Sequence, residues 1–151
     1  MSRTLLIIDV QTGFRSAGDA TMQKNICDEI RRAKKRKAAI IVLEYEGFGP
    51  TYLPIQQAIG DYQRFAVAQK GEDDGSEPVL QTALQRRFNR SRWRVCGVNI
   101  AYCVNKTVKG LRARIPNTDI EVKQDACNCR YGVQKGWRKF DRANGQAVKR
   151  I

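Results

Sequence analysis

The sequence predicts an α/β fold in three layers: an open, mainly parallel sheet with helices on both faces. Apolar runs of strand length alternate with amphipathic runs of helix length, and this order is typical of a parallel sheet covered on both sides. The length of 151 residues suits one domain. We therefore expect a single domain over residues 1–151, with right-handed connections between its strands.

The first half of the chain alternates strand, helix and strand. Residues 3–9 form an apolar run, and the helix expected over 19–37 carries one apolar stripe, made of Met22, Ile26, Ile30 and Ala33. Residues 38–43 are apolar and rich in β-branched side chains, which favours a second strand. A glycine- and proline-containing loop (44–54), a short helix (53–60) and a third strand (64–68) are expected next.

The second half repeats the alternation. Ser76 is expected to be the N-cap of a helix that has Pro78 in its first turn. A fourth strand is expected over 92–96, a helix over 101–114 and a fifth strand over 119–122. Residues 132–149 are weakly periodic and predict a last helix.

Charge and cysteine content narrow the functional classes. The formal net charge is +13, which creates a field that attracts anions and nucleic acid, but the basic residues are scattered and no zinc-finger or RNP-type motif is present. Apolar runs are too short to span a bilayer, and the N-terminus does not resemble a signal peptide. The five cysteines are therefore expected to be reduced thiols in a cytoplasmic protein.

Two reactive residues are expected just beyond strand ends. Asp9 closes the first apolar run, and Cys103 lies in the first turn of the helix that follows Gly97. Active sites of open α/β sheets lie at the carboxyl ends of strands, and the amides at a helix N-terminus favour a thiolate. The sequence therefore suggests an enzyme built on a cysteine, at a place where its thiol can become a thiolate.

Four segments, taken together and in order, resemble the isochorismatase-like cysteine hydrolases, a family that includes nicotinamidases and carbamoylsarcosine amidases. The segments are Leu-Leu-Ile-Ile-Asp-Val-Gln-Thr-Gly-Phe over 5–14, Gln69-Lys70, Gly-Val-Asn-Ile-Ala-Tyr-Cys-Val over 97–104, and Val-Lys-Gln-Asp-Ala over 122–126. They are spread over most of the chain. The resemblance implies a Rossmann-like sheet and a hydrolase that cleaves an amide or related C–N bond of a small molecule.

The resemblance also implies roles for individual residues. The catalytic triad would be Asp9, Lys70 and Cys103: Lys70 would stabilise the thiolate, and Asp9 would move the proton. The thiolate would attack a carbonyl and give a thioester. The oxyanion hole would be formed by the backbone amides of Asn99 and Cys103, with a cis peptide bond between Val98 and Asn99.

The chain departs from the family at the metal site. Nicotinamidases of the family hold a metal with one aspartate and several histidines, and this chain has no histidine. We therefore expect no metal and no cofactor. Glu44 and Glu46 could bind a hard cation, but a solvated loop is the better interpretation. Cys127 and Cys129 have a spacing that suits zinc poorly, and their role is left open.

The residues around the predicted site leave some alternatives open. Gln11 and four aromatic residues that follow strand ends are candidates for the pocket lining: Phe14, Tyr45, Phe48 and Tyr102. The acidic residues over 72–77 could pair with Lys70, select a cationic substrate or form a solvated loop.

Two function hypotheses follow. The leading one is a cytoplasmic cysteine hydrolase with a small-molecule substrate, possible assembly into a homo-oligomer and no membrane partner. The alternative is a catalytically altered relative whose basic surface binds nucleic acid or an acidic partner; nucleic acid is thus a possible partner but not the predicted one.

Overall fold

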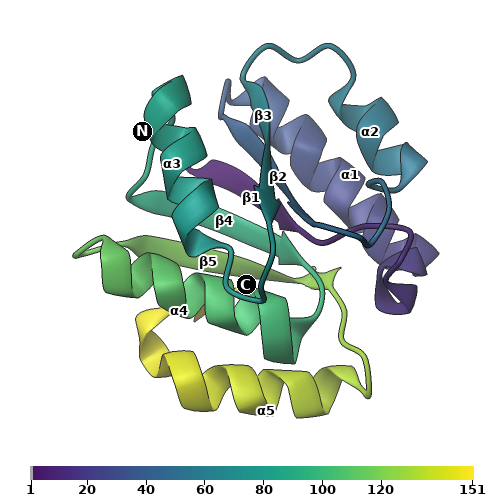
Figure 1. Ribbon diagram of the computed structural model, residues 1–151, viewed down its shortest axis with the longest axis vertical. Helices are drawn as coiled ribbons and strands as arrows, with labels where there is room; N and C mark the ends of the chain where they lie inside the picture. Colours follow the sequence, from purple (N-terminus) through teal and green to yellow (C-terminus); the bar gives the residue numbers. More distant parts are fainter. Residues whose placement is uncertain (1) are drawn as a thin grey trace.

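The computed structural model describes residues 2–151 and shows a three-layer α/β arrangement (Figure 1). A six-stranded sheet has the order β3-β2-β1-β4-β5-β6, and every pair of neighbouring strands is parallel. The strands are β1 Thr4–Ile8, β2 Ile40–Tyr45, β3 Phe65–Lys70, β4 Arg92–Gly97, β5 Asp119–Cys127 and β6 Lys149–Arg150.

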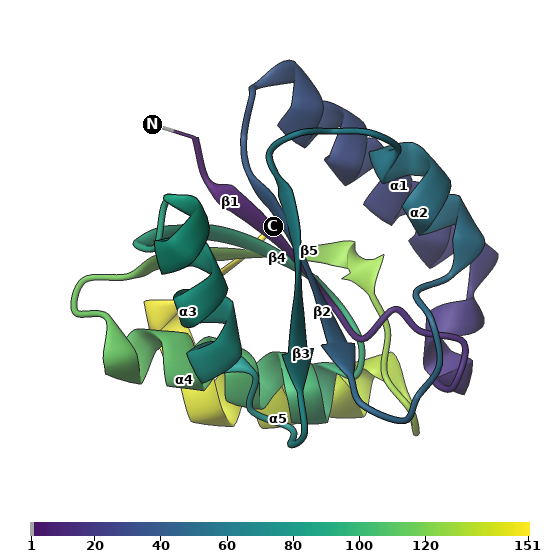
Figure 2. The same cartoon turned by 45° about the horizontal axis from the view of Figure 1, so that its top comes forward.

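Helices cover both faces of the sheet, as predicted. Figure 2 shows α1 (Ala20–Lys35) and α2 (Leu53–Ile59) together on one face, and α3 (Ser76–Arg86), α4 (Asn105–Arg114) and α5 (Val133–Asn144) on the other. Among residues 2–151, no helix is both long and apolar enough to cross a membrane.

The central strands form the core because their side chains are apolar on both faces. Leu6, Ile7 and Ile8 of β1 have no exposed surface. The apolar stripe expected on the first helix is buried against the sheet: Met22, Ile26, Ile30 and Ala33. Asp19 caps this helix, accepting a hydrogen bond of 2.7 Å from the Met22 amide.

Three strands continue beyond the residues expected from hydropathy. β2 runs to Tyr45 and β3 to Lys70, and the two polar ends remain paired in register, Glu44 with Gln69 and Tyr45 with Lys70. The side chain of Gln69 also donates to Glu44 (3.0 Å). β5 extends to Cys127, although its residues turn polar earlier. Ladder hydrogen bonds, which do not depend on hydrophobicity, explain the extensions of β2 and β3.

Other local expectations need correction. The N-cap of α3 is Gly75, not Ser76. The Gly75 amide donates to Thr107 Oγ1 (3.0 Å), and the Ser76 amide donates to Asp74 (2.9 Å). The helix expected over 101–114 is divided into a π-helical turn, Ile100–Val104, and α4. The helix expected over 132–149 ends at Asn144, and a short sixth strand follows it.

Candidate active site

The carboxyl ends of three strands bring the predicted site residues to one edge of the sheet. Asp9 directly follows β1, Lys70 ends β3, and Cys103 lies in the turn that follows β4. Asp9 has a left-handed backbone (φ 56°), which aspartate tolerates better than most residues. Its carbonyl accepts a hydrogen bond from the Gln11 amide (2.8 Å), so the chain turns sharply where the strand ends.

Asp9 and Lys70 form a fully buried ion pair. Lys70 Nζ lies 3.0 Å from Asp9 Oδ2, with side-chain exposures of 1% and 0%. The ammonium also donates to the Asp73 carbonyl (2.9 Å) and lies 4.5 Å from the centre of the Tyr45 ring. Within residues 2–151, neither carboxylate oxygen of Asp9 accepts a well-directed hydrogen bond. A buried acceptor without such a partner is rare in folded proteins and calls for an explanation.

The surroundings of Cys103 differ from the expected thiolate site. Burial raises the pKa of the Cys103 thiol to about 12; the negative charge of Asp9 raises it further, and the Lys70 ammonium opposes both effects. Burial likewise raises the pKa of the Asp9 carboxyl, and Lys70 opposes this shift. The raised pKa favours a neutral Cys103 thiol, which lies within electrostatic reach of the Asp9 carboxyl and the Lys70 ammonium. Burial therefore outweighs the effect of the nearby ammonium on the thiol pKa.

The segment before Cys103 is held firmly in place. The peptide bond between Val98 and Asn99 is cis. The side-chain oxygen of Asn99 accepts hydrogen bonds from Ser16 Oγ (2.6 Å) and from the Arg130 amide (2.8 Å). No acceptor within residues 2–151 bonds the backbone N–H of Asn99. This amide, predicted for the oxyanion hole, is thus available to a ligand.

A cavity of about 1210 Å³ opens above these residues. Cys103, Asn99 and four predicted aromatic residues line it: Phe14, Tyr45, Phe48 and Tyr102. Phe14 and Phe48 stack face to face, with ring centres 4.3 Å apart. The prediction for Gln11 is wrong, because its buried side chain bonds the backbone of Tyr45 and Gly49 and does not reach the cavity.

Asp73 belongs to the cavity, although the sequence pointed only to an acidic loop. Its Oδ1 accepts a hydrogen bond from the Tyr45 hydroxyl (3.3 Å) and lies 3.8 Å from Cys103 Sγ, while its Oδ2 pairs with Lys106 (3.2 Å). Its carbonyl accepts hydrogen bonds from Lys70 Nζ (2.9 Å) and Thr107 Oγ1 (3.3 Å). The loop therefore contacts Lys70 through its backbone rather than through its carboxylates.

The remaining acidic and sulfur groups are dispersed over residues 2–151. Both carboxylate oxygens of Glu44 already accept hydrogen bonds. The amide and hydroxyl of Thr51 donate to Oε2, and the side chain of Gln69 donates to Oε1. Within the described part of the chain, no group of three or more histidine, cysteine, aspartate or glutamate residues could hold a metal ion. The residues after β2 do not fit the histidine-containing metal site of the family's nicotinamidases. All five cysteines are free thiols; Cys127 is buried at the end of β5, and Cys129 lines the cavity.

Comparison with solved structures identifies the fold, whereas the two comparisons that use the sequence find no match. No protein-family model matches the sequence, and no curated protein matches it significantly. The structure is similar to a nicotinamidase from Staphylococcus aureus, with a TM-score of 0.80 and 16% identity over 99% of this chain and 98% of that one. An N-carbamoylsarcosine amidase from Thermoplasma acidophilum matches with a TM-score of 0.77 and 15% identity over 99% and 96%.

A third similar structure has a different activity. The MAR1 ribonuclease from Caenorhabditis elegans matches with a TM-score of 0.79 and 18% identity over 97% of this chain and 76% of that one. Identities this low describe the fold alone. The sheet order, the helix layers and these similarities together show that the chain has the fold of the isochorismatase-like hydrolases.

Proposed function

We propose that this protein is a cysteine-dependent hydrolase that cleaves an amide or related C–N bond of a small molecule through a thioester intermediate. One observation carries the proposal: the buried Asp9–Lys70 pair, whose carboxylate lacks a well-directed hydrogen bond, interacts electrostatically with the Cys103 thiol, which lines a cavity. A purely structural ion pair would normally be satisfied by further hydrogen bonds. The amidases and nicotinamidases that share the fold support the same reaction class.

The first half of the reaction begins from the neutral thiol. As Sγ of Cys103 bonds to the carbonyl carbon, its proton passes to the Asp9 carboxylate, so no free thiolate has to accumulate near pH 7. The amides of Asn99 and Cys103 stabilise the oxyanion. The C–N bond then breaks, and Asp9 returns the proton to the leaving nitrogen. Lys70 stabilises the negative charge, which moves between oxygen and sulfur.

The second half releases the acid product. Water loses a proton to Asp9 and attacks the thioester carbon, the C–S bond breaks, and Cys103 recovers its proton. Water and amide are consumed, and acid and amine are formed, so no oxidant or cofactor is required. The activity should fall as the pH drops through the raised pKa of Asp9, because the protonated carboxyl no longer accepts a proton.

The cavity indicates what kind of molecule fits. It has about 1210 Å³ of space, and its lining combines the stacked rings of Phe14 and Phe48 with polar groups that include Asp73 and Asn128. A planar or aromatic amide would stack on these rings and direct its carbonyl toward Cys103.

The test is a panel of amides, ureas and carbamoyl compounds, with release of ammonia or amine as the readout. Cys103→Ala should abolish hydrolysis, while the matched control Cys27→Ala, on α1, should retain it. Acid quenching during turnover should leave an acyl group on Cys103, detectable by mass spectrometry. Full activity in Cys103→Ala would refute the proposal. A Cys103 that reacts with no electrophile would favour the catalytically altered alternative.

A further inference from the structure

A stripe of positive charge follows the outer side of α5. Lys135, Arg138, Lys139 and Arg142 are exposed and recur at the i, i+3, i+4, i+7 spacing that places side chains on one face of a helix. The single acidic residue of α5, Asp141, is already paired with Arg150 (3.3 Å). No carboxylate within residues 2–151 comes within salt-bridge distance of the four cations.

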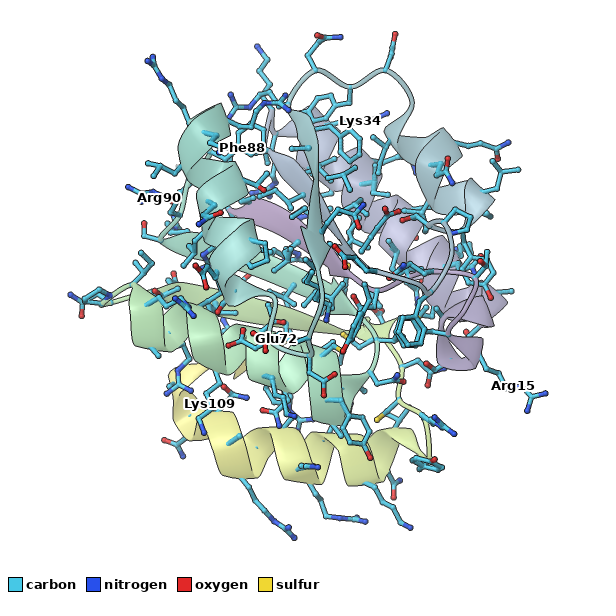
Figure 3. All side chains as sticks on the ribbon, in the orientation of Figure 1. Arg15, Lys34, Glu72, Phe88, Arg90 and Lys109 are labelled. Atoms are coloured by element: carbon cyan, nitrogen blue, oxygen red, sulfur yellow. The ribbon has the colours of Figure 1, made fainter. Side chains whose placement is uncertain are left out.

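The neighbouring helix α4 enlarges this positive surface. Figure 1 shows α4 and α5 side by side, and Figure 3 shows the labelled Lys109 projecting from α4. Lys109 is exposed and has no carboxylate partner among the described residues. Residues 101–118, which include all of α4, contain no aspartate or glutamate. We call the exposed surface of these two helices the α4–α5 face.

The α4–α5 face reaches the mouth of the candidate active site. The ammonium of Lys139 lies 4.7 Å from the centre of the Tyr102 ring, and Tyr102 lines the cavity. On α4, Lys106 pairs with Asp73, which also lines it. An anionic chain bound along α5 would therefore lead directly to the cavity.

One exposed aromatic ring, that of Tyr131, lies in the lining of the cavity. Tyr131 is 67% exposed and lines the cavity, and the guanidinium of Arg130 lies 4.8 Å from the centre of its ring. Proteins that bind single strands combine a positive surface for the phosphates with exposed rings on which unpaired bases stack. An acidic peptide would use the cations but would have no need of the rings, and in a duplex the bases are not free to stack on a side chain.

We propose that the α4–α5 face binds single-stranded nucleic acid, with phosphates on the cations of α5 and a base stacked on Tyr131 at the cavity mouth. The opposite face of the sheet is less suited, because Lys24 and Arg31, two of the exposed cations of α1, both already pair with Asp28. This binding function goes beyond the hydrolysis proposed above and does not depend on it.

The first experiment separates the α4–α5 face from overall charge. A triple variant of α5, Lys135→Gln, Arg138→Gln and Arg142→Gln, is compared with a control on α1 and its C-cap, Lys24→Gln, Lys35→Gln and Arg36→Gln. Each removes three positive charges from the net +13. Binding of a labelled single strand of about 12 nucleotides, as RNA and as DNA, is followed by fluorescence anisotropy over about 0.05–0.2 M salt.

The wild type should bind with a steep salt dependence. The α5 variant should bind at least about tenfold more weakly, and its salt slope should fall by about 2, since each phosphate contact to a single strand contributes about 0.7. The α1 control should bind like the wild type. Melting temperatures of both variants verify that they fold.

The second experiment tests the stacking ring. Tyr131 has a left-handed backbone (φ 72°), which asparagine tolerates, so Tyr131→Asn removes the ring without threatening the fold. It should weaken binding about fivefold or more, and Tyr131→Phe, which keeps the ring, should not. A saturating single strand should also slow alkylation of Cys103, a readout that requires no catalytic activity.

Three results would overturn the proposal. The first is absence of binding at about 0.15 M salt. The second is an equal loss in the α5 and α1 variants, which would mean general attraction to the net charge. The third is polyglutamate that competes as well as nucleic acid of equal charge, which would assign the face to an acidic protein. Tighter binding of RNA than of DNA, or the reverse, would identify which nucleic acid the face prefers and would support the proposal.

Discussion

Asp9 and Lys70 are two charges placed where a folded protein normally keeps apolar side chains. Both are almost completely buried, at 3.0 Å from each other, at the ends of β1 and β3. Burying an ion pair seldom stabilises a protein more than apolar residues of similar size would, but removing one partner leaves an unpaired charge. The stability of the site therefore depends on both charges together, and a double-mutant cycle reveals this.

We predict that Lys70→Met destabilises the protein by about 3–5 kcal/mol, because it leaves the Asp9 carboxylate buried without its counter-ion. Asp9→Asn should also destabilise it, and the double variant should be more stable than the sum of the two effects implies. Urea unfolding of the four proteins measures this. Strictly additive losses would mean that the two groups do not form an energetically coupled pair.

Asp73 adds a third carboxylate to the site, and its effect is electrostatic. With Oδ1 3.8 Å from Cys103 Sγ and a partly exposed side chain, it should repel anionic reagents from the sulfur. We predict that Asp73→Asn raises the rate of Cys103 alkylation by iodoacetate about fivefold relative to neutral iodoacetamide, corresponding to about 1 kcal/mol of repulsion in a well-hydrated site. An unchanged ratio of the two rates would show that Asp73 faces away from the approaching reagent.

At the scale of elements, the close approach of β1 and β4 fixes the position of the turn that carries Cys103. Gly97 has φ +124°, and a Cβ there would lie 2.1 Å from the Ile8 carbonyl oxygen, so a side chain would force the strands apart. Gly132 has a similar backbone (φ +114°) with no atom within 4 Å of the corresponding Cβ position. Substitutions at Gly97 and Gly132 therefore separate the effect of backbone strain on stability from the effect of steric crowding.

We predict that Gly97→Ala destabilises the protein by more than about 3 kcal/mol, whereas Gly132→Ala costs only the strain of its backbone, about 1–2 kcal/mol. Thermal or urea unfolding supplies the comparison. Equal losses would show that the strands adjust freely and that the position of the Cys103 turn does not depend on Gly97.

The elements also show how far the sequence determines the structure. Apolar periodicity placed β1, β4 and the buried stripe of α1, because burial drives their formation. It did not predict that β2 runs to Tyr45 and β3 to Lys70, because the ladder hydrogen bonds between these polar residues leave no hydrophobic pattern in the sequence. It did not reveal β6, which has only two residues. Similarly, Asp73 could be placed beside Cys103 only by the fold of its loop, not by its neighbours in sequence.

The whole molecule carries an unusually large charge for its size. The net charge of +13 on 151 residues creates self-repulsion that opposes the compact state. Twelve ion pairs are formed among residues 2–151, and several are exposed, so they compensate little of it. Salt screens the repulsion between surface charges more than it weakens the buried pair of Asp9 and Lys70.

We therefore predict that the melting temperature rises as sodium chloride is increased from about 0.02 to 0.2 M, by about 2–4 °C for each 1 kcal/mol of repulsion that is removed. Differential scanning calorimetry at constant pH tests this. A fall in melting temperature over this range would mean that attractive surface pairs outweigh the net repulsion.

The most direct test of the central claim is the pH dependence of Cys103 alkylation in the wild type and in Asp9→Asn, followed by mass spectrometry of the Cys103 peptide. In the wild type, burial and the Asp9 charge hold the pKa of the thiol at about 12, so the rate should still be rising well above pH 9. In Asp9→Asn, the loss of that negative charge beside a retained Lys70 should shift the profile to lower pH. Identical profiles in the two proteins would contradict the claim that Asp9 and Cys103 belong to one site.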